Sequence, residues 1–159
     1  MMPRWGVGAI ALAVIVADRV SKLAVAHAMG VGQSVTVIPG VLWLTYILNS
    51  GAAFGLFQHG TPVFIGVGLG LLAMVAVYLW RHPVLKRATG TGLGLLAGGT
   101  VGNLWDRILS GRVIDFIHFR FFPFFFNLAD SAIVVGIGLW LIAQWCQDRK
   151  EGSRARDGK

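Results

Sequence analysis

The chain has 159 residues, of which 55% are hydrophobic and only 13% are charged. Because a soluble domain carries roughly 25% charged residues, this composition excludes an ordinary cytosolic protein and indicates lipid as the solvent. The segment from Leu23 to Trp80 contains no Asp, Glu, Lys or Arg. The formal net charge is +7, but the basic residues lie mainly at segment ends and in the tail. They do not form the basic patch of a nucleic-acid-binding protein, so no nucleic acid is expected as a partner.

Four apolar segments have the length of a membrane span, which needs about 20 mainly apolar residues for a hydrocarbon core of roughly 30 Å. They cover about 5–28, 62–80, 88–105 and 128–147. The second segment also has helix punctuation, because Thr61 suits an N-cap and Pro62 a first helical turn. The sequence therefore predicts a membrane all-α bundle of four transmembrane helices within one domain, 1–147.

The first segment has an alternative interpretation. Arg4, the apolar run after it and the "AHA" at 26–28 are also typical of a cleavable secretory signal. Asp18, Arg19 and Lys22 fit a signal peptide poorly, and a permanent helix is favoured.

The basic residues predict the orientation of the bundle, since loops rich in Lys and Arg stay in the cytoplasm. Nine of the fourteen lie before the first span, between the second and third, or after the fourth. Both termini are therefore expected in the cytoplasm of a bacterial cell, with the uncharged loop at about 29–61 outside. The tail, 148–159, is predicted to be cytoplasmic and disordered.

The outer loop contains "SVTVIPGVLWLTYIL" at 34–48, which is rich in β-branched and aromatic residues around a Pro-Gly turn. This pattern predicts two short strands. With Trp43 and Tyr46, the strands suit a small extracytoplasmic β-sheet cradle at the membrane surface.

The third span carries glycine at every fourth position on one helix face: Gly90, Gly94, Gly98 and Gly102. Small residues at this spacing let helices approach closely in lipid. Gly99 lies one position away from that register, which indicates a separate reason for its presence.

Several polar residues interrupt the apolar spans, where charge is costly and is kept for pairing, ion pathways or chemistry. Asp18 and Lys22 stand four apart on the first helix, and both an internal salt bridge and a direct functional role are open. Asn103, Asp106 and Arg107 share a face at the outer end of the third helix. Arg107 could pair with Asp106 or reach a carboxylate on another segment.

Two aspartates are expected to converge near the outer end of the bundle. Asp115 lies in the apolar stretch "RVIDFIHF", and Asp130 lies near the start of the fourth span, three residues after Asn127. Asp130 could simply be a helix N-cap. Alternatively, two close carboxylates share a proton, so that one activates water while the other acts as an acid. This aspartic-protease chemistry needs no metal and no cofactor, although polar clusters in membranes also mark ion pathways.

Neither a disulfide nor a zinc site is expected from the cysteine and histidine pattern. Cys146 is the single cysteine, and the four histidines are scattered along the chain.

Five sequence blocks together resemble the bacterial lipoprotein signal peptidases, also called signal peptidase II. They occur in the order of that family and span nearly the whole chain: "DRVSK" (18–22), "NSGAAFG" (49–55), "GGTVGNLWDR" (98–107), "RVIDFIHF" (112–119) and "FNLADSA" (126–132). Two departures are Arg19, where Gln is commoner, and the phenylalanine-rich "FPFFFN".

The resemblance implies an aspartyl endopeptidase of the inner membrane that cleaves prolipoproteins just before a diacylglyceryl-modified cysteine. It implies Asp115 and Asp130 as the catalytic pair, Asp18 and Lys22 as supporting residues, and the antibiotic globomycin as an inhibitor. The positions that match the family's pocket residues are Asn49, Gly99, Asn103, Arg107, Asn127 and Ala129.

Two other functions are consistent with the residues alone. A proton-linked carrier or channel could use Asp18, Asp115 and Asp130 as relays, although carriers favour ionisable groups near the midplane and often contain internal repeats. A noncatalytic scaffold held together by the glycine face would leave Asp115 unexplained.

Overall fold

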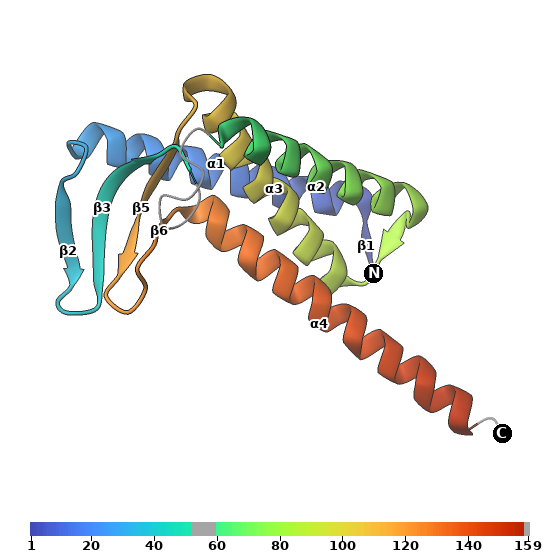
Figure 1. Cartoon of the computed structure of the whole chain (residues 1–159). Helices are drawn as coiled ribbons and strands as arrows, with labels where there is room; N and C mark the ends of the chain where they lie inside the picture. Colours follow the sequence, from blue (N-terminus) through green and yellow to red (C-terminus); the bar gives the residue numbers. More distant parts are fainter. Residues whose placement is uncertain (52–59, 158–159) are drawn as a thin grey trace.

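The computed structural model describes residues 1–51 and 60–157, and within these ranges the chain forms four long helices and six short strands (Figure 1). The helices are α1 (Arg4–Ala28), α2 (Thr61–Arg81), α3 (Arg87–Ser110) and α4 (Leu128–Asp157). The strands are β1 (Met2–Pro3), β2 (Ser34–Ile38), β3 (Leu42–Asn49), β4 (Val84–Leu85), β5 (Val113–Phe119) and β6 (Phe125–Phe126). Residues 52–55 of the "NSGAAFG" block lie outside the described residues.

All four predicted spans fall within helices of the structure. Among the described residues, two helices are long and apolar enough to cross a membrane by length and composition, at Thr61–Arg81 and Leu128–Gln147. Helix α1 has a comparable length but carries Asp18, Arg19 and Lys22 in its second half.

The surface of α1 reverses the polarity of a helix on a soluble protein. Asp18 and Lys22 are buried, at 1% and 0% exposure, whereas Leu12, Val16 and Val20 are more than half exposed. A helix of a soluble protein normally buries its apolar stripe and exposes its charged residues. The arrangement in α1 suits a helix with lipid on one side and a polar bundle interior on the other.

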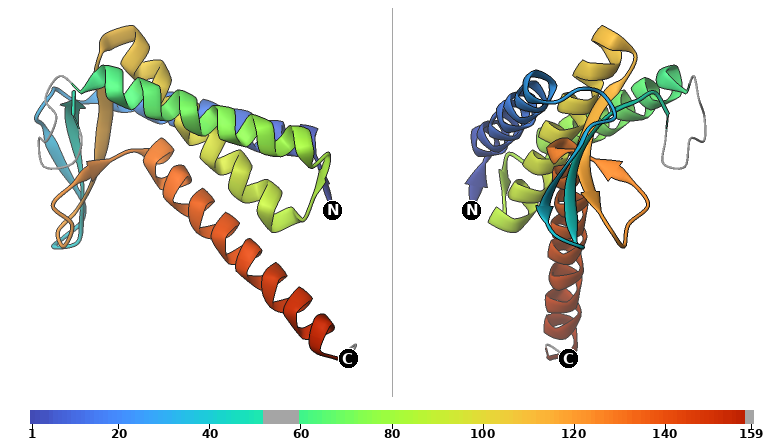
Figure 2. Two further views of the ribbon diagram at one scale, coloured as in Figure 1. Left: turned by 45° about the vertical axis from the view of Figure 1, so that its right-hand side comes forward. Right: turned by 90° about the vertical axis from the view of Figure 1, so that its left-hand side faces the viewer.

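Helix α3 packs against α1, α2 and α4 and forms the centre of the bundle (Figures 1 and 2). The predicted glycine face allows this approach, because a Cβ added at Gly98 would lie 2.6 Å from the Ala11 carbonyl oxygen of α1. Gly92, outside that face, lies against Gly136 of α4 in the same manner. Added methyl groups would push both helices apart.

A four-stranded antiparallel sheet with the order β2-β3-β5-β6 covers one end of the bundle (Figure 2). The two strands predicted at 34–48 are confirmed as β2 and β3. Strand β5 joins them from much later in the chain and pairs Asp115 with Ile47. Val25 of α1, Tyr46 and Phe116 form a small buried cluster that attaches the sheet to the helices.

Helix α4 extends further than the sequence indicates. The sequence predicts a disordered tail from residue 148, whereas α4 continues to Asp157. An existing helix extends without a new nucleation step, and Arg, Lys and Glu are favourable helix residues. The charged composition of the tail therefore did not end the helix.

Candidate active site

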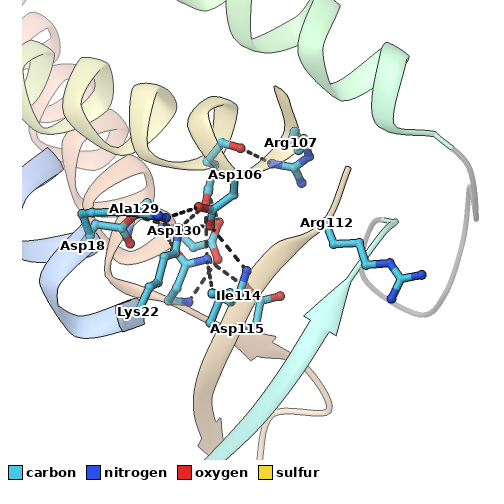
Figure 3. A network of polar contacts seen from close by, with 12 residues as sticks. Asp18, Lys22, Asp106, Arg107, Arg112, Ile114, Asp115, Ala129 and Asp130 are labelled. Carbon is cyan, nitrogen blue, oxygen red and sulfur yellow. Dashed lines mark hydrogen bonds and ion pairs between the residues drawn. The ribbon is translucent and has the colours of Figure 1, made fainter. Parts of the chain in front are cut away.

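A polar cluster lies where the sheet meets the helices, built from α1, α3, β5 and the start of α4 (Figure 3). Asp115 of β5 and Asp130 in the first turn of α4 both line a cavity of about 950 Å³. Asp115 is only 2% exposed. The convergence of the two aspartates that the sequence predicts is therefore present in the structure.

Asp130 closes the first turn of α4 together with Asn127. The Asn127 Oδ1 atom accepts the backbone N–H of Asp130 at 2.9 Å, and Asp130 Oδ2 accepts the backbone N–H of Asn127 at 3.1 Å. This reciprocal pair is a capping box in which Asn127 is the N-cap and Asp130 is the third helical residue. The remaining oxygen, Asp130 Oδ1, accepts a hydrogen bond from Asn103 Nδ2 at 2.6 Å.

Two amides hold the carboxylate of Asp115. Asn127 Nδ2 donates to Asp115 Oδ1 at 2.7 Å, and Asn49 Nδ2 donates to Asp115 Oδ2 at 2.8 Å. Asn127 is fully buried and contacts both aspartates, one through its side-chain amide and one through the capping box. One asparagine therefore fixes the relative position of the two carboxyl groups.

The surroundings of Asp115 favour its protonated form. Burial, and after it the neighbouring Asp130 carboxylate, raise the pKa of its carboxyl group to about 7. The hydrogen bonds from Asn49 and Asn127, and the charge of Lys22, oppose this rise in pKa. Near neutral pH, this carboxyl group can both release and accept a proton.

The salt bridge between Asp18 and Lys22, one of the two alternatives left open by the sequence, is present and belongs to a larger buried network (Figure 3). The Lys22 ammonium lies 2.7 Å from Asp18 Oδ2 and 2.9 Å from Asp106 Oδ2, and it donates to Asn103 Oδ1 at 3.2 Å. Asp18 Oδ1 in turn accepts the backbone N–H of Ala129 at 2.9 Å. The network thus connects α1 directly to the first turn of α4.

Asp106 is a site residue that the sequence analysis did not assign to the site. Its carboxylate forms ion pairs with the Lys22 ammonium and, at 3.1 Å, with the Arg19 guanidinium. Its Oδ2 atom also accepts the backbone N–H of Ile114 at 3.4 Å. Asp106 stands three residues after Asn103, so the two side chains lie on neighbouring positions of one helix face. This three-residue spacing from Asn103 was the sequence feature that could have placed Asp106 in the site.

Arg107 makes neither of the ion pairs considered from the sequence. Its Nη1 donates to the Asn103 carbonyl at 3.4 Å, and its guanidinium lies 5.0 Å from the centre of the Phe64 ring. Among the described residues, no ion pair joins Arg107 to a carboxylate. Asp106 forms its ion pairs with Lys22 and Arg19 instead. Arg107 lines the cavity together with Asp115 and Asp130.

Gly99 explains how the start of α4 approaches α3. A Cβ at this position would collide with the Ala129 carbonyl oxygen, and Ala129 is fully buried. The close approach of Ala129, the residue next to Asp130, to α3 therefore requires glycine at position 99. Since Gly99 faces α4 whereas Gly98 faces α1, its departure from the predicted register has a physical reason.

The cavity combines these polar groups with an apolar wall. Besides the aspartates, Asn49 and Arg107, it is lined by aromatic and aliphatic residues that include Phe64, Phe122, Phe126, Val134 and Val135. Within the described residues, no group of three or more His, Cys, Asp or Glu is arranged to hold a metal ion. The arrangement can hold an apolar substrate segment with one bond beside two carboxyl groups.

Comparison with known proteins assigns this architecture to a family. Residues 10–146 match the family model of signal peptidase (SPase) II. The lipoprotein signal peptidase of Desulfitobacterium hafniense is 45% identical over 134 residues, covering 84% of this chain and 89% of the relative. That of Symbiobacterium thermophilum is 38% identical and covers 89% and 95% of the two chains.

Solved structures agree with this assignment. Two structures described as bacterial membrane enzymes, determined by the in meso method, superpose with TM-scores of 0.82 and 0.78. Their sequences are 31% and 32% identical, and the matches cover 89% and 87% of this chain and 88% and 91% of theirs. The fold is shared with bacterial membrane enzymes, and the matched family is one of proteases. The chain belongs to the signal peptidase II family, as the five sequence blocks predict.

Proposed function

We propose that this protein removes signal peptides from prolipoproteins by cleaving before a cysteine that bears diacylglycerol. Membership of the signal peptidase II family and the names of the relatives support the reaction. The observation that carries the mechanism is the placement of Asp115 and Asp130 on one cavity, with Asn127 bonded to both. This arrangement supports a pair of catalytic aspartates.

In the proposed reaction, one aspartate is ionised and the other is protonated. The ionised carboxylate takes a proton from water, and the oxygen of that water attacks the carbonyl carbon before the cysteine. The protonated aspartate hydrogen-bonds the carbonyl oxygen and supplies the proton that the leaving nitrogen needs. The C–N bond breaks, giving a signal-peptide carboxylate and a free cysteine amine, and no cofactor takes part.

The residues around the pair have supporting roles in this proposal. Asn49, Asn103 and Asn127 orient the carboxyl groups, and Arg107 binds the substrate backbone on the cavity wall. Gly99 and Ala129 let α4 approach α3 closely enough to present Asp130. Asp18 and Lys22 hold the start of α4 through the Ala129 backbone and the Asn103 side chain.

The proposed setting is the bacterial inner membrane, with all four helices spanning it, both termini in the cytoplasm and the sheet outside. The exposed apolar face of α1 supports a lipid environment for that helix despite its internal charges. The aspartates then lie near the outer interface. A lipid-modified cysteine, whose acyl chains remain in the membrane, presents its peptide bond at this depth.

The direct test is incubation of the purified protein with a prolipoprotein in lipidated and unlipidated forms. We expect cleavage of the diacylglyceryl form with strong preference, and inhibition by globomycin bound in the cavity. Acyl burial contributes roughly 0.8 kcal/mol per methylene, which holds the bond at the depth of the aspartates. Equal cleavage of both forms in a competition assay would contradict the proposed lipid requirement.

A further inference from the structure

A smaller groove lies beside the active-site cavity, on the hairpin that joins β5 and β6. It has a volume of about 370 Å³ and is lined by Phe119, Phe121, Phe122 and Phe126. The Phe122 N–H donates to the Phe119 carbonyl at 3.0 Å and closes the turn, and the Phe119 and Phe126 rings stack with centroids 5.8 Å apart. Phe121 is 83% exposed, so the groove presents an open aromatic surface.

The groove is continuous with the cavity that holds the aspartates. Phe122 and Phe126 line both spaces. Side chains alternate along a strand, so Asp115, Ile117 and Phe119 share one face of β5. Phe126 pairs with Ile117 on the neighbouring strand and lies on the same face. Phe122 and Phe126 therefore form a continuous apolar wall between the cavity that holds Asp115 and the phenylalanine groove.

On the basis of the proposed function, we propose that this groove binds one acyl chain of the diacylglyceryl group on the substrate cysteine. The cysteine follows the scissile bond directly, so its glycerol thioether lies beside the aspartates when that bond is positioned for attack. The attached acyl chains must then leave the cavity along an apolar wall. The groove is lined by phenylalanine alone and offers an acyl chain burial without loss of a polar contact.

Photochemical labelling tests the occupant without cleavage. The probe is a synthetic peptide whose cysteine carries a diacylglyceryl group with a diazirine near the end of one acyl chain. It is bound to the Asp115→Asn variant in bicelles, irradiated, and mapped by mass spectrometry. A phosphatidylglycerol with the same diazirine acyl chain serves as the lipid control at equal concentration.

We expect labels from the peptide probe at 119–126, reduced at least tenfold by an excess of unlabelled diacylglyceryl peptide. Labels confined to α2 and α4, near Phe64 and Val134, would overturn the proposal. Equal labelling of 119–126 by the phosphatidylglycerol probe, unaffected by the peptide, would also overturn it and identify the occupant as bilayer lipid. Labelling of 119–126 by the peptide, combined with failure of the unsubstituted protein to cleave it, would refute the proposed function but leave the groove assignment standing.

Acyl-chain selectivity gives a second readout with matched variants. We expect Phe121→Ser to lower the preference for a long-chain over a short-chain diacylglyceryl peptide, measured as the ratio of kcat/KM values, by about tenfold. Phe121→Leu, which keeps an apolar wall, should retain that preference. Val37→Ser removes a half-exposed apolar side chain from β2, outside the groove, and controls for contact of the sheet with lipid. An equal loss of preference in Val37→Ser and Phe121→Ser would contradict a specific groove.

Discussion

Asn127 and Asp130 exchange two hydrogen bonds across the first turn of α4, each side chain accepting the backbone N–H of the other residue. Through its amide nitrogen, the same Asn127 donates to Asp115 at 2.7 Å. A helix cap and a pair of carboxyl groups are therefore one structural unit. Asp130 can stabilise the start of α4 by accepting a hydrogen bond, and it can take part in catalysis by gaining and losing a proton. A substitution that keeps the first property and removes the second distinguishes these roles.

The Asp130→Asn variant separates these two roles. The Asn side chain keeps one oxygen that can accept the Asn127 N–H, but its amide nitrogen then faces the donor nitrogen of Asn103, so the variant should insert and lose only about 1–3 kcal/mol of stability. It cannot gain and lose a proton, so kcat/KM for a lipidated substrate should fall by on the order of 10³-fold or more. The measurement compares matched amounts of folded protein, and an active variant would leave Asp130 with a capping role alone.

The Asp115→Asn variant provides the partner experiment. It should lose activity to a similar extent, because the proposed reaction needs one ionised and one protonated carboxyl group at the same time. The double variant should then be scarcely worse than either single variant, as expected for groups that act together. Additive losses would indicate two independent contributions.

The pH dependence of stability should report the buried Asp115 carboxyl group. Its pKa is raised to about 7 in the folded protein, so the folded state retains a proton that the unfolded chain releases from about pH 4 upward. The contribution of Asp115 to the free energy of unfolding therefore decreases as the pH rises from 4 to 7, and is constant above that range. At 1.36 kcal/mol per pKa unit, the total change is at most about 4 kcal/mol.

Thermal unfolding of the unsubstituted protein and Asp115→Asn from pH 4 to 9 checks this expectation. The variant lacks the titrating group, so its stability relative to the unsubstituted protein should increase between pH 4 and 7 and remain constant above pH 8. A constant difference across the whole range would show that Asp115 titrates at an ordinary pKa in the folded state.

Gly99→Ala should disturb the site without altering any of its polar groups. The added methyl group would collide with the Ala129 carbonyl and displace the start of α4, which carries Asp130. We expect a loss of about 1–3 kcal/mol of stability, typical of overpacking, and at least a tenfold loss of activity. Gly138→Ala is the matched control, because its Cβ meets no atom within 4 Å. Equal behaviour of the two variants would contradict the role given to Gly99.

Arg107→Lys should show whether activity requires the planar guanidinium group of Arg107 or only its positive charge. Lysine keeps the positive charge but lacks the planar group that lies over Phe64 and donates to the Asn103 carbonyl. We expect the variant to insert normally and to lose at least about tenfold in kcat/KM. A double-mutant cycle with Phe64→Leu should give less than additive losses, whereas near-normal turnover of Arg107→Lys would indicate that charge alone is enough.

The sequence predicted the features that depend on local pattern. Apolar length located the four helices, β-branched residues around Pro39-Gly40 located β2 and β3, and four-residue spacing placed Lys22 beside Asp18. The convergence of Asp115 and Asp130 also followed from topology, since both were expected at the same end of the bundle. A proton-sharing role for the two aspartates was one of the alternatives open from the residues alone, and the family resemblance favoured it over a cap or an ion pathway.

The features that escaped prediction depend on how the elements pack. Asp106 and Arg107 are adjacent in the sequence, but one side chain enters the Lys22 network and the other lines the cavity. This division follows from the placement of α1 and α2 around α3, which residue spacing within α3 cannot reveal. The fourth span was expected to begin near Leu128, as α4 does, but the sequence did not reveal that Asn127 is the N-cap and that its side chain and that of Asp130 accept each other's backbone N–H.

The two cations that contact Asp106 should differ strongly in their contributions to stability. Lys22 is fully buried between Asp18, Asp106 and Asn103, whereas the Arg19 side chain is 40% exposed. Lys22→Met leaves two buried carboxylates without their shared partner, and breaking such a pair costs about 3–5 kcal/mol. Arg19→Gln removes a partly exposed ion pair, worth about 0–1 kcal/mol, and leaves Lys22 bound to Asp106.

Thermal unfolding of the two variants in the same detergent measures this difference, with the amount of folded protein recovered from membranes as a second readout. Lys22→Met should also lose activity, because Lys22 holds Asn103, and Asn103 donates to Asp130 at 2.6 Å. Adding Asp18→Asn to Lys22→Met should recover part of the lost stability, since it removes one of the stranded charges. Equal destabilisation by Lys22→Met and Arg19→Gln would show that burial does not set the strength of this network. Failure of Asp18→Asn to recover any stability would show that the stranded Asp18 charge is not what destabilises Lys22→Met.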